Sequence, residues 1–229
     1  MNIIIIGGTR GIGKEVAILL AQERNNHILV TGRNEDALKS LSEQFKNIYS
    51  LSLDLAKFDS HAESFGKVVS SYFTSVDILI NMAGMIIVKD FINISSAEAR
   101  LMIETNFIGP ASVIKIIKPL MQKGSHIVNI SSMGGFQGSS KYNGLSYYSA
   151  SKAALASLSE CLAVEFAESG ICVNCLALGA VQTEMFEEAF PGYKAPVEAK
   201  EMAEFISDFA IKGHKFMNGK IIPVAINNP

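Results

Sequence analysis

Short apolar runs recur along the chain, and stretches with helical periodicity separate them. The first run, residues 2–6, is rich in isoleucine and ends at a pair of glycines, as a buried parallel strand does. Residues 12–22 then carry apolar side chains at helical spacing, at Ile12, Val16, Leu19 and Leu20. The alternation continues, so we predict strands near residues 2–6, 27–31, 47–53, 76–80, 125–131, 171–177 and 219–225, with helices in most of the intervals.

Alternation of strands and helices predicts an α/β fold, in which a doubly wound parallel sheet of about seven strands carries helices on both faces. A chain of 229 residues with 48% hydrophobic content can bury one large core, and it shows neither an internal repeat nor a low-complexity linker. We therefore expect a single domain over residues 1–229. A ligand of such a fold crosses the carboxyl edge of the sheet, where the strand order reverses.

Charge and composition exclude several classes of partner. The net charge of −2 and the isoelectric point near 6.1 leave no basic excess for nucleic acid or an anionic membrane. The amino terminus enters the first strand almost at once, without a signal segment, and no apolar run approaches the length of a membrane span. We expect a cytoplasmic protein that binds neither nucleic acid nor a membrane.

The cysteines and histidines give little support for a metal site. Cys172 and Cys175 form a Cys-x-x-Cys pattern, but they lie in a predicted strand, where an offset of three points two side chains to opposite faces. Cys161 stands apart, and the four histidines have no ligand spacing. We read Cys172 and Cys175 as core residues, take the three cysteines to fit a reducing compartment, and predict no metal.

The glycines after the first strand have a pattern typical of nucleotide binding. Gly7, Gly11 and Gly13 follow the spacing Gly-x-x-x-Gly-x-Gly at a strand-to-helix turn. The free N–H groups of such a turn can hold a pyrophosphate. Taken alone, the pattern also fits a purely structural turn.

A second pattern points to acid–base chemistry. Tyr148 and Lys152 are one helical turn apart, so their side chains share a face. The lysine ammonium favours the phenolate and is expected to move the pKa of Tyr148 toward neutral pH, where the tyrosine can act as an acid or base. Tyr147 is a rival phenol, but no lysine lies four residues after it. Alone, a Tyr-x-x-x-Lys pair is a weak signal, because both residues are common.

Further motifs follow in a fixed order along the chain: Asp54-Leu55, Asn81-Met82-Ala83-Gly84, Asn106, Ile130-Ser131-Ser132, Leu178-Gly179 and Thr183. With the glycine turn and the Tyr-x-x-x-Lys pair, they make nearly the whole chain resemble the classical short-chain dehydrogenase/reductase family. The resemblance implies a Rossmann fold that binds a nicotinamide dinucleotide. It also implies hydride transfer between the nicotinamide and a carbonyl or alcohol substrate.

The resemblance assigns roles to individual residues. Tyr148 would donate a proton to the substrate oxygen, Ser132 would hydrogen-bond that oxygen, Lys152 would hold the nicotinamide ribose, and Asn106 would hold a water that connects Lys152 to solvent. Ser132 is preferred to Ser131 because Ser132-Met-Gly-Gly matches the family's Ser-x-x-Gly. The catalytic set implied is Asn106, Ser132, Tyr148 and Lys152. The cofactor-binding set implied is Gly7, Thr9, Arg10, Gly11, Ile12, Gly13, Arg33, Asp54, Leu55, Asn81, Ala83, Gly84, Tyr148, Lys152, Gly179, Val181 and Thr183.

The end of the second strand bears on the choice of cofactor. NAD-preferring members of the family usually place an acid there, whereas this chain has Gly32 followed by Arg33. Arg33 and Arg10 could both bind a 2′-phosphate through charge-assisted hydrogen bonds. We therefore predict NADP(H) as the preferred cofactor and NAD(H) as less suitable. The alternative is that Arg33 only begins a solvated helix.

The chain departs from the family pattern at several positions. Ile6, Met82 and Leu178 replace the usual threonine, asparagine and proline, and the stretch 137–146 is a few residues longer than usual. The family's Val-Asp-Gly-Gly is missing from the carboxyl-terminal stretch 218–229. A short substrate loop is expected at about 184–197. Its apolar side chains would cover a partly apolar substrate or, alternatively, pack against the core or a neighbouring subunit; they are Met185, Phe186, Phe190 and Tyr193.

Three functions remain open on the sequence alone. An NADPH-dependent carbonyl reductase comes first, and a 3-oxoacyl-(acyl-carrier-protein) reductase second, with Lys141 and Lys194 as candidate contacts for the acidic carrier. A catalytically idle nucleotide-binding regulator or scaffold is the third. The resemblance implies a homodimer or homotetramer formed through the helix before Pro119 and the helix carrying Lys152. The apolar side chains of the second helix would serve the core and the interface together; they are Ala153, Ala154, Leu158 and Leu162.

Overall fold

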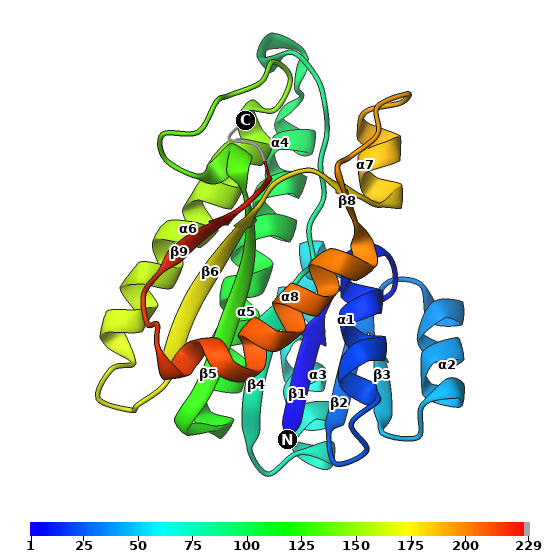
Figure 1. Ribbon diagram of the computed structural model, residues 1–229, viewed down its shortest axis with the longest axis vertical. Coiled ribbons are helices and arrows are strands. Elements are labelled where there is room, and N and C mark those ends of the chain that lie inside the picture. Colours follow the sequence, from blue (N-terminus) through cyan, green and yellow to red (C-terminus); the bar gives the residue numbers. More distant parts are fainter. Residues whose placement is uncertain (227–229) are drawn as a thin grey trace.

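The computed structural model describes residues 1–226, so the last three residues of the predicted domain 1–229 lie outside the described residues. Its central element is a parallel sheet of seven strands in the order β3-β2-β1-β4-β5-β6-β9 (Figure 1). The strands are β1 (Asn2–Ile6), β2 (His27–Gly32), β3 (Ile48–Ser52), β4 (Val76–Asn81), β5 (Met121–Ser132), β6 (Cys172–Leu178) and β9 (Ile221–Val224). The predicted doubly wound fold is confirmed, and the strand order reverses between β1 and β4.

Helices cover both faces of the sheet. The long helices are α1 (Gly11–Ala21), α2 (Glu35–Gln44), α3 (Phe58–Tyr72), α4 (Ser96–Ile103), α5 (Gly109–Ile117), α6 (Ser146–Glu165) and α8 (Ala199–Lys212). One core packs α1, α2 and α8 against one face, and a second core packs α3, α5 and α6 against the other. In Figure 1, α1 and α8 lie side by side in front of the sheet.

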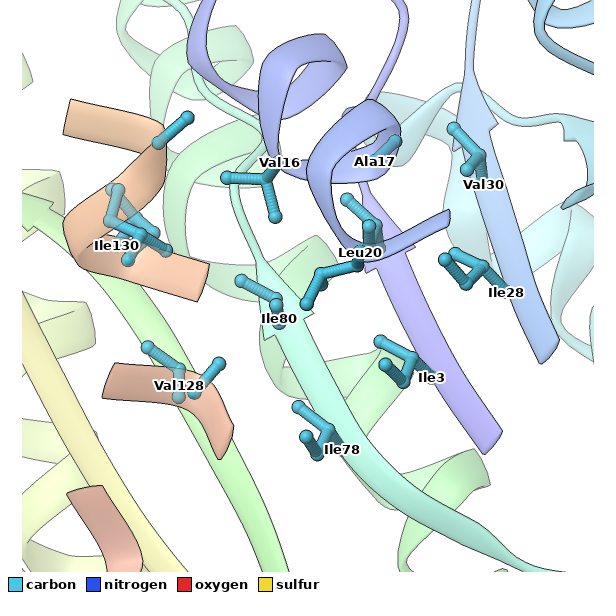
Figure 2. Close-up of a cluster of buried hydrophobic side chains, with 14 of the residues drawn as sticks. Ile3, Val16, Ala17, Leu20, Ile28, Val30, Ile78, Ile80, Val128 and Ile130 are labelled. Atoms are coloured by element: carbon cyan, nitrogen blue, oxygen red, sulfur yellow. The ribbon is translucent and has the colours of Figure 1, made fainter. Parts of the chain in front are cut away.

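Apolar side chains of α1 face the strands beneath it. Figure 2 shows Val16 and Leu20 of α1 directed toward Ile3, Ile28 and Ile80 of three neighbouring strands. All five side chains are almost fully buried. Burial of an aliphatic side chain of this size contributes about 1.5–3 kcal/mol to folding. The helical spacing of the apolar residues in 12–22 therefore fixes which face of α1 meets the sheet.

Two details differ from the sequence prediction. Strand β5 begins at Met121 rather than near residue 125, because Ser125 bridges an irregular pairing: its hydroxyl donates to Val76 O and accepts from Gln122 N. The short pair β7 (Val181–Gln182) and β8 (Val197–Glu198) was not predicted. This pair brackets α7 (Glu184–Ala189), which lies beyond the carboxyl ends of the sheet strands (Figure 1).

None of the helices within residues 1–226 has the length and apolar character needed to cross a membrane. The same part of the chain contains no group of three or more histidine, cysteine or acidic side chains placed to hold a metal ion.

Candidate active site

The turn between β1 and α1 is tightly packed and requires its glycines. Gly7 and Gly11 have φ values of +91° and +51°, in the left-handed region that favours glycine. A Cβ atom on Gly13 would lie 2.1 Å from Gly7 O. The N–H groups of Gly7 and Gly8 both donate to Thr31 O at the end of β2, at 3.0 and 2.9 Å. The turn is therefore fixed against the carboxyl edge of the sheet.

Helix α1 begins at Gly11, directly after this turn, and Arg10 at its N-cap position makes no capping hydrogen bond with its side chain. The first N–H groups of a helix have no partners within the helix and attract anions. The turn has both the shape and the unpaired donors that a pyrophosphate requires. These unpaired N–H groups are the structural feature that fits the pyrophosphate of a nicotinamide dinucleotide.

A cavity of about 780 Å³ runs along the carboxyl edge of the sheet and joins the predicted residues into one site. The cofactor-binding candidates that line it are Gly7, Thr9, Arg10, Gly11, Ile12, Gly13, Arg33, Asp54, Leu55, Ala83, Gly84, Tyr148, Lys152, Gly179, Val181 and Thr183. Ser132 lines it as well. The walls do not include Asn81 or Asn106, which the sequence had placed in the site.

Asn81 ends β4, but its side chain points into the protein. It is 1% exposed, and its Nδ2 donates to Asn129 Oδ1 on the neighbouring strand β5 at 2.7 Å. Asn129 in turn donates to Ser159 Oγ of α6 at 2.9 Å. The side chain of Asn81 therefore supports the sheet beneath the cavity, which corrects the expectation that it lines a ribose.

Tyr148 and Lys152 lie on the first turns of α6 and line the cavity together. Lys152 is 4% exposed, and its Nζ donates to Ile130 O at 2.8 Å. Burial lowers the pKa of Lys152 to about 8, and the nearby Cys175 thiol acts in the opposite direction. A buried lysine that titrates in this range can exchange a proton near neutral pH.

The pKa of Tyr148 is raised in the structure, mainly by burial, and a hydrogen bond with the Ser132 hydroxyl partly opposes this rise. The sequence argument expected the reverse, with Lys152 lowering the pKa. Desolvation of the phenol is the dominant cause, and the Lys152 ammonium, which donates to the Ile130 carbonyl, is not among the groups that shift this pKa. Tyr148 therefore lies in the cavity beside Ser132 as a protonated phenol at neutral pH.

The two adjacent serines have different surroundings. Ser131 Oγ donates to Lys152 O at 2.8 Å, so it fixes the start of α6 to the end of β5. Ser132 Oγ accepts from Gly134 N at 3.2 Å, and its hydroxyl lies near enough to the Tyr148 phenol to lower the pKa of that group. The geometry supports the choice of Ser132 over Ser131 as the hydroxyl that meets a substrate oxygen.

Asn106 is fully buried in a single π-helical turn (Glu104–Ile108) between α4 and α5. Its Oδ1 accepts from Met85 N at 2.8 Å, and its Nδ2 donates to Met85 O and to Ser151 Oγ, both at 2.9 Å. Both amide protons are used inside the protein. A water in the expected relay could therefore only donate to Oδ1 of this side chain, which lies behind the cavity wall.

Two arginines lie at the end of the cavity next to the glycine turn. Arg33 is exposed just past β2, and Arg10 Nη1 contacts Glu188 Oε1 of α7 at 2.8 Å. A Cβ on Gly32 would lie 2.5 Å from Thr9 Cγ2, so an acidic residue at that position would require the Thr9 side chain to move. This end of the cavity therefore presents cations where an NAD-type site presents a carboxylate.

The other end of the cavity is apolar. The predicted loop residues Met185, Phe186, Phe190 and Tyr193 all line it. Four further lining residues were not predicted, because they belong to three separate stretches that carry no motif; they are Ile86, Met133, Tyr142 and Leu145. Glu184 lines the cavity as well, but its carboxylate lies near Gly11 of the glycine turn rather than among these apolar side chains. A neutral, partly apolar molecule suits these walls better than an anion.

Lys141 holds the loop that follows Ser132. Its Nζ donates to Gly134 O, Phe136 O and Ser139 Oγ at 2.8, 2.7 and 2.8 Å. A lysine with three internal acceptors is poorly placed to bind a carrier protein, so the expectation for Lys141 is corrected. The sequence could not predict these hydrogen bonds, because two of the three acceptors are backbone carbonyls, which leave no residue pattern.

Cys172 and Cys175 have separate environments. Cys175 is fully buried beside Lys152, and burial raises its pKa to about 11. Cys172 Sγ contacts His214 O at 3.6 Å instead. The two thiols do not share a partner, as the alternation of a strand predicts.

Comparison with known proteins agrees with this geometry. The model of the short chain dehydrogenase family matches residues 1–194. Carbonyl reductase family member 4 of Xenopus tropicalis is 33% identical over 183 residues, which is 79% of this chain and 75% of the relative. A 3-oxoacyl-(acyl-carrier-protein) reductase of Staphylococcus epidermidis is 32% identical over 190 residues, covering 80% and 75%.

Solved structures show the same architecture. The structure described as ElxO with NADP bound is 27% identical, has a TM-score of 0.82, and is covered over 96% of its length by 98% of this chain. The seven-stranded sheet, the glycine turn and the family match over residues 1–194 lead to one conclusion. The chain belongs to the short-chain dehydrogenase family of oxidoreductases.

Proposed function

We propose that this protein reduces a carbonyl group to a hydroxyl group with NADPH. The observation that carries the proposal is the meeting of Ser132, Tyr148 and Lys152 in the cavity that begins at the glycine turn. A bound nicotinamide would supply the hydride. The protein's own task is to bind the carbonyl compound, stabilise charge on its oxygen and deliver a proton to that oxygen.

Tyr148 donates that proton. The phenol carries its proton at neutral pH, as its ordinary pKa near 10 already requires, and burial raises that pKa further. The Ser132 hydroxyl, already a partner of the phenol, meets the same substrate oxygen and stabilises the developing alkoxide. Lys152, with a pKa of about 8, lies one turn away, where it holds the nicotinamide ribose and stabilises the phenolate left after transfer.

Preference for NADP(H) over NAD(H) rests on Arg10, Arg33 and Gly32. The two cations lie at one end of the cavity, and Gly32 lacks the carboxylate that would repel a 2′-phosphate. Asp54 and Leu55 are proposed at the adenine, Ala83 and Gly84 at its ribose, and Gly179, Val181 and Thr183 at the nicotinamide. A related structure described with NADP bound is consistent with this preference.

The substrate is proposed to be a neutral, partly apolar carbonyl compound that α7 and the loop 184–197 cover. A 3-oxoacyl-(acyl-carrier-protein) substrate is the second candidate, favoured by a relative of that description. Lys141 is occupied by internal acceptors, which leaves Lys194 as the remaining cation of the two. An idle regulator is disfavoured, because Ser132, Tyr148 and Lys152 are all in place.

We also propose a cytoplasmic homodimer or homotetramer that associates through α5 and α6. Val164 on α6 is 77% exposed, although it is apolar. Light scattering at micromolar concentration is expected to return a mass of at least two chains, and a monomer mass would refute this assembly.

A fluorescence titration with NADPH and NADH tests the function, followed by neutral ketones, diketones and 3-oxoacyl thioesters in the same cuvette. Tighter binding of NADPH and its oxidation by neutral carbonyl compounds are expected. Oxidation by 3-oxoacyl thioesters alone would select the second candidate. Failure to bind either nucleotide would reject the proposal.

A further inference from the structure

Helix α7 contacts the glycine turn at both of its ends. Near its start, a Cβ on Gly11 would lie 3.2 Å from Thr183 Cγ2 and 3.5 Å from Glu184 Oε2. Near its end, Glu188 Oε1 accepts a hydrogen bond from Arg10 Nη1 at 2.8 Å, across 178 residues of sequence. The helix that covers the substrate end of the cavity is thus ion-paired to a residue at the cofactor end.

This ion pair conflicts with the role proposed for Arg10. A 2′-phosphate that approaches Arg10 meets the carboxylate of Glu188 on the same guanidinium, and two anions at one cation repel each other. We infer that Glu188 is a specificity-determining residue that weakens the binding of 2′-phosphorylated cofactors by competing for Arg10. The inference rests on the proposed use of Arg10 by NADP(H).

The expected effect is moderate. The side chains of Arg10 and Glu188 are 45% and 63% exposed, and water and salt screen such a pair. An exposed ion pair changes an equilibrium by about twofold to fivefold. Arg33 has no carboxylate within ion-pair distance in the described part of the chain, so it keeps most of its attraction for the phosphate.

The chain offers a matched control on the same helix. Glu187 is the neighbouring exposed carboxylate of α7, and its Oε1 accepts from Gln182 Nε2 at 2.6 Å rather than from Arg10. Glu187→Gln and Glu188→Gln remove the same charge from nearly the same place. Only the second variant frees Arg10.

The test measures dissociation constants for NADPH and NADH by fluorescence titration. Glu188→Gln is expected to bind NADPH about twofold to fivefold more tightly than the wild type, with NADH unchanged. Glu187→Gln is expected to leave both constants close to those of the wild type. In an Arg10→Gln background, Glu188→Gln is expected to have no effect on NADPH, because the competition no longer exists.

Different results separate the two proposals. If wild-type protein prefers NADPH but Glu188→Gln does not tighten it, or tightens NADH equally, the inference about Glu188 fails and the cofactor proposal stands. A gain that persists in the Arg10→Gln background also overturns the inference. If the wild type does not prefer NADPH, the cofactor proposal fails and the role of Glu188 fails with it.

The ratio of dissociation constants for 2′,5′-ADP and 5′-ADP gives a second readout that needs no nicotinamide and no turnover. Glu188→Gln is expected to improve binding of the first nucleotide only. Equal improvement of both nucleotides would show general charge repulsion and would contradict the inference.

Discussion

Strands β5 and β6 carry two buried polar clusters, which differ in whether they reach the cavity. The first, against α8, is closed: His126 Nδ1 contacts Ala210 O at 2.9 Å, and His126 Nε2 contacts Asn174 Nδ2 at 3.0 Å. Asn174 also donates to Met217 O and accepts from Lys220 N. These side chains are hydrogen-bonded to each other and to backbone groups below the protein surface.

The second cluster, against α6, is open. It consists of Asn129, Ser131, Lys152, Ser159 and Cys175, and two of its members, Ser131 and Lys152, line the cavity. The structure records one hydrogen bond from the Lys152 ammonium, which can donate three. A buried polar side chain therefore indicates a functional site when it lines a cavity and still has hydrogen-bonding groups without a recorded partner. Burial alone does not indicate such a site.

The largest expected effect comes from the open cluster. Lys152→Met should lower turnover by at least about a hundredfold, because it removes the cation one turn from Tyr148. Thermal stability should stay equal or rise, since the variant relieves a buried charge. Steady-state kinetics and a thermal melt check both. Turnover within tenfold of the wild type would place the chemistry elsewhere.

The closed cluster should instead affect stability. Burial lowers the pKa of His126 from its ordinary 6.5 to about 4, so the unfolded chain binds a proton in that window and the folded chain resists it. Stability is therefore retained above pH 6.5 and lost as the pH falls toward 4. Between about pH 7 and pH 5 the loss is about 2 kcal/mol.

Chemical denaturation at the two pH values measures this loss. His126→Leu should flatten the pH dependence, whereas the exposed His61→Leu should leave it as in the wild type. If the stability of His126→Leu depended on pH as steeply as that of the wild type, the closed cluster would not be the cause of that dependence.

A smaller effect is expected from Lys141, which holds the Ser132 loop from outside. Lys141→Met should lower kcat a few-fold, on the order of 1 kcal/mol, without changing cofactor affinity. In a Ser132→Ala background it should cost nothing further, because both changes act through the same hydroxyl. Lys194→Met serves as the control. Additive losses would show that Lys141 acts by another route.

Much of the fold could be predicted, because the signals are local. Apolar runs gave the seven strands, and the glycine spacing gave a turn whose Gly13 lies against Gly7 O. Tyr148 and Lys152 were found because one helix carries both. In each case the physical cause lies within a few residues of sequence.

The remaining features depend on partners distant in sequence. Asn81 pairs with Asn129 across two strands, and Glu188 pairs with Arg10 across nearly the whole chain. The pKa of Tyr148 was expected to fall because the sequence shows a lysine one helical turn away but not the burial that raises this pKa. Spacing indicates which residues share an element, and burial and direction follow only from the packed structure.

The central claim is that Tyr148, one helical turn from Lys152 of the open cluster, performs the proton transfer. Its most direct test is the NADPH oxidation rate of Tyr148→Phe beside Tyr147→Phe, measured with a neutral ketone that the wild type reduces. Tyr147 stacks on Phe91, with ring centroids 5.7 Å apart, and makes a matched control. Tyr148→Phe should lose turnover by at least about a hundredfold and still bind NADPH, while Tyr147→Phe stays active. Turnover retained in Tyr148→Phe would contradict the account.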